Sequence, residues 1–206
     1  MTRLWTAIWV AAAIVAASAG PGRAEQDGID KAAADAFDGR MFAGPPGKKA
    51  YACFVRRYDA GHLAQHPRQK VGAMQLLVSW EIPSDQQISN YSFRLGIKYR
   101  HRPGDFDSSG DCGHVAAADT GQEIRLGCGV DCDGGGIEVA LSKDDKSAIV
   151  RLERITVWQR NKPDDDAGDA LLAGAEDKMF RLDRAAPDQC AALVTDRKEL
   201  AALRHR

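Results

Sequence analysis

The chain has 206 residues, with 28 lysines and arginines against 29 aspartates and glutamates, and a formal net charge of −1. This near-neutral balance does not favour nucleic acid as a partner, because phosphate binding depends on clustered cations. The length suits one domain with a substantial hydrophobic core and is short for two. We therefore expect a single globular domain.

The first 24 residues have the pattern of a secretory signal peptide. Arg3 precedes an apolar run from Leu4 to Ala17, and small residues follow, with cleavage sites expected after Ala19 or after Ala24. The run is shorter than the roughly 20 residues that a membrane-spanning helix requires. We expect cleavage, a periplasmic or secreted protein, and no stable membrane span afterwards.

Residues 25–49 mix alanine, glycine, proline and charge, and they predict a flexible leader with a short helix around Ile29–Phe37. In the β domain expected at residues 50–206, apolar side chains recur at every second position, as in NYSFRLGIKYR at 90–100. This alternation is typical of half-buried strands. We expect nine strands, at residues 51–58, 72–80, 90–100, 114–118, 123–128, 136–142, 147–153, 154–159 and 178–183.

Turn residues separate these strands, and no long helical pattern lies between them. This order predicts an antiparallel all-β fold of about eight to nine strands, either an up-and-down barrel or a meander sandwich. The pattern does not choose between the two. Near the C-terminus, Asp196 as N-cap, Glu199 three residues later, and leucines at 200 and 203 predict a short helix.

Five cysteines follow the signal peptide: Cys53, Cys112, Cys128, Cys132 and Cys190. Disulfides are the expected state of paired cysteines in an exported chain. If residues 119–121 form a three-residue hairpin loop, Cys112 lies opposite Cys128 at a separation that a disulfide can span. Cys53 and Cys190 would then tie the ends of the domain together and leave Cys132 as a free thiol.

Other cysteine arrangements stay open at this point. A loop of another length makes Cys112–Cys132 equally reasonable, and an odd cysteine also permits a covalent dimer. Cys128 and Cys132 have three residues between them, whereas the thioredoxin-type redox motif has two and begins a helix. We therefore expect structural rather than catalytic cysteines.

Two short motifs offer weak signals for metal binding. In DFDSSGD at 105–111, Asp105, Asp107 and Ser109 match the first ligands of a calcium loop, and Asp111 follows, but the twelfth position is not glutamate. Asp/Gly turns explain this stretch and DCDGGG at 131–136 equally well. The histidines His62 and His66 have the spacing of zinc ligands on a helix, although the neighbouring glycine and proline favour an exposed turn. We predict no cofactor and keep calcium as an alternative.

No catalytic motif is present, so the catalytic residues are unknown and we do not expect an enzyme. The favoured function is an exported, disulfide-stabilised β-domain that binds an unknown small molecule or cell-envelope component, or has a structural role. Alternatives are a calcium- or metal-dependent protein that uses Asp105–Asp111, and a hydrolase or redox enzyme whose site has no readable motif.

Two sets of side chains are candidates for ligand binding. In a closed barrel, a ligand would lie in the mouth against Trp80, Tyr91 or Tyr99. The opposite face of the strand at 90–100 and the residues after it are cationic, beside FVRRY at 54–58, and could hold an anion; they are Arg94, Lys98, Arg100 and Arg102. Solubilising charge on an exposed sheet face is the favoured interpretation of these cations.

Overall fold

The computed structural model describes residues 29–43, 49–83, 89–117, 123–160, 162 and 168–204. The expected signal peptide and the expected hairpin loop at 119–121 lie outside these residues. Among the helices that are described, none is long and apolar enough to cross a membrane.

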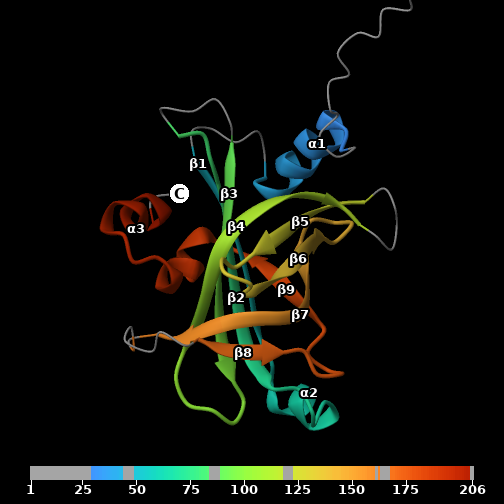
Figure 1. Cartoon of the computed structure of the whole chain (residues 1–206), viewed down its shortest axis with the longest axis vertical. Coiled ribbons are helices and arrows are strands. Elements are labelled where there is room, and N and C mark those ends of the chain that lie inside the picture. Colours follow the sequence, from blue (N-terminus) through green and yellow to red (C-terminus); the bar gives the residue numbers. More distant parts are fainter. Residues whose placement is uncertain are drawn as a thin grey trace, which may run out of the picture.

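Nine antiparallel strands form the sheet (Figure 1): β1 (Lys49–Arg57), β2 (Val71–Glu81), β3 (Asn90–Tyr99), β4 (Phe106–Ala116), β5 (Ile124–Gly129), β6 (Gly135–Leu141), β7 (Ser147–Gln159), β8 (Asp169–Leu172) and β9 (Met179–Ala185). Strands β1 to β7 follow one another around the sheet, and β9 pairs with both β7 and β1. Eight strands therefore close into a ring, and the fold is the barrel rather than the sandwich. The prediction of an antiparallel all-β fold with a short C-terminal helix is confirmed.

Strand β7 combines two of the strands that the alternation predicts, 147–153 and 154–159, so that division is wrong. Ile137 of β6 lies opposite Leu152, while Gly135 lies opposite Ile155, which marks a β-bulge in the pairing. A bulge shifts the inward-facing positions by one residue, so the alternation changes phase within a continuous strand. Beyond β9, the same edge of β7 pairs with β8.

Strand β4 starts earlier than expected. The sequence predicts a turn at 105–111 and a strand only at 114–118, but the structure has one strand from Phe106 to Ala116. Phe106 and Ser108 are buried, and Asp107 is on the other face. The sequence does not indicate this strand, because its small and acidic residues are disfavoured in strands and typical of turns.

The barrel interior is filled by side chains. Its largest fully buried members are Phe54, Phe93, Phe106, Phe180, Met74 and Leu76. Helix α1 (Lys31–Met41) closes one end, because Phe37 and Met41 pack into the same core. Arg184 of β9 donates hydrogen bonds to the carbonyl oxygens of Arg40 and Met41 at 3.0 and 2.8 Å. These bonds supply donors to carbonyl groups that have no partner within the last turn of the helix.

A second apolar cluster covers the outer face of β1 and β2. The 3-10 helix η1 (Pro187–Leu193) and helix α3 (Arg197–Arg204) supply Cys190, Leu193 and Leu203, which pack on Cys53 and Leu77. The Asp196 carboxylate accepts a hydrogen bond from the Glu199 backbone amide at 2.8 Å, as the expected capping pattern requires. The C-terminal segment therefore leaves only part of this sheet face open.

Candidate functional site

The structure contains two disulfides, Cys53–Cys190 and Cys112–Cys128. Cys112 and Cys128 are opposed in the β4–β5 register that the sequence suggested. Cys132 is a free, exposed thiol with a positive φ of 55° in the β5–β6 turn. The disulfides join strands to each other and to the C-terminal segment, so they stabilise the fold.

The aspartates of the expected calcium loop are on or beside strand β4 and not in a loop. Asp105 forms an ion pair with Lys98 at 2.9 Å, and Asp107 accepts two hydrogen bonds from Arg160 at 2.6 and 2.5 Å. Asp107, Ser109 and Asp111 alternate along one face of an extended strand, so they do not surround a common point. Within the described residues, no group of three or more His, Cys, Asp or Glu side chains could hold a metal ion.

Two of the three aromatic side chains expected at a barrel mouth lie together, and the third does not. Trp80 and Tyr91 are paired at the end that α1 closes, whereas Tyr99 is near the opposite end, against Phe106. The Asp38 carboxylate of α1 accepts hydrogen bonds from the Tyr91 hydroxyl at 2.6 Å and from the His114 ring at 2.9 Å. Burial, and then the adjacent Asp38, raise the pKa of Tyr91. Side chains of α1 and of the strands therefore occupy this mouth.

All four expected cations have partners within the chain, and three of them hold a neighbouring segment. Arg94 forms an ion pair with Glu199 of α3 at 2.9 Å. Arg100 donates to the carbonyl oxygen of Leu63 at 2.9 Å and so holds helix α2 (Ala60–Gln65). Arg102 lies 4.2 Å above the Phe106 ring and pairs with Asp169. Most of this cationic set therefore stabilises neighbouring segments of the chain.

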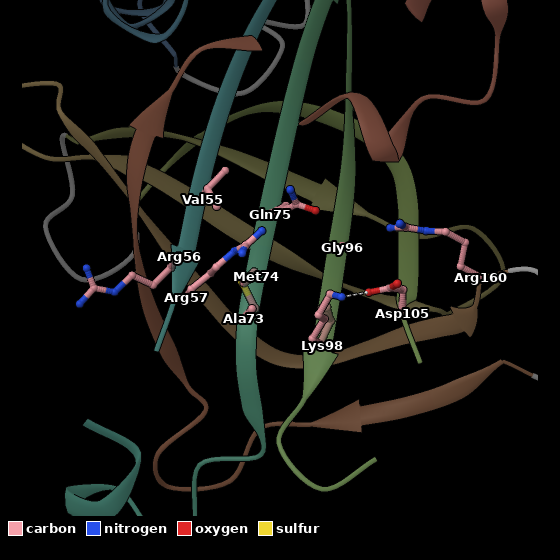
Figure 2. Close-up of a pocket in the computed structure, with 11 residues that line it drawn as sticks. Val55, Arg56, Arg57, Ala73, Met74, Gln75, Gly96, Lys98, Asp105 and Arg160 are labelled. Atoms are coloured by element: carbon pink, nitrogen blue, oxygen red, sulfur yellow. Dashed lines mark ion pairs between the residues drawn. The ribbon is translucent and has the colours of Figure 1, made fainter. Parts of the chain in front are cut away.

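The fourth cation, Lys98, borders a depression on the outer face of β1, β2 and β3, which we call the arginine depression (Figure 2). It is shallow, with a volume of about 30 Å³. The main lining residues are Arg57, Ala73, Gln75, Gly96, Lys98 and Arg160. Figure 2 shows Arg57 reaching over the strand that carries Gln75 and Arg160 approaching from the opposite side, with the Lys98–Asp105 pair on the Arg160 side.

The floor of the arginine depression is formed by small residues, and one of them lies close against η1. A Cβ atom on Gly96 would lie 2.7 Å from Cδ2 of Leu193 in η1. The Gln75 side chain donates to the backbone carbonyl of Gln189 at 2.8 Å and closes the side next to η1. The C-terminal segment thus shapes the depression as well as covering the neighbouring core.

The cations around the floor differ in whether an acid is paired with them. Hydrogen bonds to Asp107 raise the pKa of Arg160 and fix its guanidinium in place. Lys98 is paired with Asp105, while Arg57 is exposed and has no ion pair with any described residue. Sequence reasoning missed Arg160, because Asp107 and Arg160 are 53 residues apart and meet only through the β4–β7 pairing.

The histidines of the expected zinc pair lie on and just after helix α2. His62 belongs to this six-residue helix, and His66 is its C-cap, so the segment is a helix and not the turn that we expected. Their rings are stacked with centroids 4.3 Å apart, and Nε2 of His62 is 2.9 Å from Oε1 of Gln69. Two stacked rings, one of which already has a nitrogen in a hydrogen bond, do not direct their nitrogen atoms at one metal ion.

Comparison with known proteins finds no match: neither a family model, nor a curated protein, nor a solved structure matches this chain.

Proposed function

We propose that this chain is an exported, disulfide-stabilised binding module that acts without catalysis and recognises an anionic group on the outside of its barrel. The observation that carries the proposal is the arginine depression, where Arg57, Lys98 and Arg160 gather around a floor of small residues. The filled barrel interior supports an external site. The signal-peptide pattern, together with two disulfides, supports export.

The charge arrangement suits a carboxylate or phosphate group. Arg160 is held in place by Asp107, and Arg57 brings a guanidinium that no described acid neutralises. Guanidinium groups donate paired hydrogen bonds that match the oxygen atoms of such anions. The room within the depression is about 30 Å³, enough for one or two waters, so the anionic group would lie over the depression and the rest of a larger ligand on the surrounding surface.

Binding of inorganic phosphate, measured by calorimetry on the oxidised full chain, tests this proposal. Arg57→Gln should weaken binding by at least about tenfold, because a charge-assisted hydrogen bond contributes about 1.5–3 kcal/mol. Lys143→Gln is the matched control, since it removes one exposed positive charge from the β6–β7 turn. Equal binding by both variants, or no binding by the unmodified chain, would contradict the proposal.

A further inference from the structure

A second hollow lies between helix α2 and the start of β9, and we call it the α2 groove. It is lined by Tyr58, His62, His66, Gln69, Lys178 and Arg181, among others. Its volume is about 540 Å³, within the range typical of small-molecule sites. Only Arg56 also lines the arginine depression, so the two sites can be altered separately.

One wall of the α2 groove is a column of three rings. Tyr58 and His62 stack with centroids 4.6 Å apart, and His62 and His66 stack at 4.3 Å. Gln69 fixes the middle ring, and Arg100 anchors the helix through the Leu63 carbonyl. The outermost imidazole is therefore held in place before any ligand arrives.

The facing wall is cationic. Lys178 is exposed and forms no ion pair with any residue that the structure describes. Arg181 uses Nε to donate to the Ser147 hydroxyl at 3.1 Å, which leaves its other N–H groups for a ligand. Arg56 is paired with Asp183 at 2.9 Å, and Glu176, the acid of the groove, faces Arg68. The wall retains a net positive charge.

We propose that the α2 groove binds an acidic sugar, with the ring stacked on His66 and the carboxylate held by Lys178 and Arg181. The C–H groups on one face of a pyranose ring carry partial positive charge and pack on the electron-rich face of an aromatic ring. The carboxylate meets the cations of the facing wall. A flat ring bearing an anionic substituent matches both walls at once, whereas a bare anion would use only one.

The groove has room for more than one sugar unit. Lys178 and Met179 also border a larger depression of about 820 Å³ on the outer face of β5, β6 and β7, with Gly127 and Gly136 among its lining residues. Met179 is 58% exposed, an apolar ridge between the two hollows. The second hollow carries both signs of charge, because Glu138 and Glu153 line it together with Arg154, so further sugar units would gain less from their carboxylates there than at Lys178.

Calorimetry with trigalacturonate, a chain of three acidic sugars, tests this proposal on the oxidised full chain. Neutral galactotriose is the matched ligand, and we expect it to bind at least tenfold more weakly. His66→Ala and Lys178→Gln should each weaken trigalacturonate binding about tenfold, while His66→Phe should retain most of it. Unchanged melting temperatures and both disulfides in each variant exclude misfolding as the cause.

Several results would overturn the proposal. These are equal binding of the neutral sugar, no effect of His66→Ala, or no trigalacturonate binding up to about 10 mM, a concentration that reveals even weak sites. Arg57→Gln separates the two sites. If it abolishes trigalacturonate binding while Lys178→Gln does not, the sugar acid lies in the arginine depression, and the α2 groove proposal fails while the proposed function stands.

Discussion

One helix lies at each end of the barrel, and the two helices differ in how much of their surface they bury (Figure 1). Helix α1, at the upper end in the figure, has 11 residues and buries Phe37, Asp38 and Met41. Helix α2, at the lower end, has six residues and buries none. We call the α1 end closed and the α2 end open. Both ends satisfy buried polar groups within the protein, Asp38 at the closed end and Gln69 and Asp177 at the open end, but the open end also presents cations and rings beside two hollows.

This difference separates groups that hold the fold from groups that are free to bind a ligand. Asp38, Tyr91 and His114 satisfy one another in a mostly buried cluster, so they stabilise α1 on the barrel. Arg57 and Lys178 have no ion pair among the described residues. Substitutions at the closed end should therefore change the free energy of unfolding, and those at the open end should change binding.

The largest effect is expected from emptying the closed end. Phe37→Ala or Met41→Ala removes a fully buried side chain and should lower the free energy of unfolding by about 3–4 kcal/mol. Leu63→Ala in α2 is the matched change at the open end and should cost less than about 1 kcal/mol, because this side chain is only partly buried. Urea denaturation measures both values. Similar losses at the two ends would contradict the comparison.

A smaller loss is expected from the polar cluster under α1. Asp38→Ala leaves the Tyr91 hydroxyl and the His114 ring without their acceptor and should cost about 2–3 kcal/mol. Tyr91→Phe removes one hydrogen bond and should cost about 1 kcal/mol. A double-mutant cycle between Asp38→Ala and Tyr91→Phe measures their coupling. Additive losses would mean that the two groups do not act together.

The same cluster predicts how stability responds to alkaline pH. The raised pKa of Tyr91 in the folded protein keeps its proton on, while the unfolded chain loses this proton above pH about 10. The contribution to stability is therefore complete below pH 10 and is lost as the pH rises further. Tyr91→Phe should make the unfolding free energy fall less steeply above pH 10. The same slope in both proteins would show that the Tyr91 environment is misassigned.

The smallest effect on stability is expected at the open end. Arg57→Gln and Lys178→Gln should each change the free energy of unfolding by less than about 0.5 kcal/mol, since both side chains are exposed and lack described ion partners. Urea denaturation provides the test alongside the binding measurements. A loss above about 1 kcal/mol would place these cations among the residues that hold the fold.

The sequence predicts the barrel class well, because long apolar alternations such as Phe93, Leu95 and Ile97 depend only on which side of a strand faces the core. Closure does not follow from alternation. It requires β9 to reach β1, a pairing between segments about 130 residues apart in the chain. The sequence predicts the register of Cys112 and Cys128, because a short hairpin sets it locally.

The sequence indicates only some of the residues of the two candidate sites. The sequence indicates Lys98 as part of a cationic strand and Arg57 as part of FVRRY. Arg160 joins them only through the β4–β7 pairing. The histidine spacing was visible, yet its stacking on Tyr58 depends on how α2 packs on the barrel end. Sites assembled from distant segments require the fold before their chemistry can be read.

The most direct test of this account is a map of backbone amide chemical shifts in the full oxidised chain as inorganic phosphate is added. The largest changes should occur around Arg57, Lys98 and Arg160, and the amides of α1 and of the Asp38 cluster should remain unchanged. Changes centred on α1, or none at the open end, would contradict the claim that the open end of the barrel binds an anion.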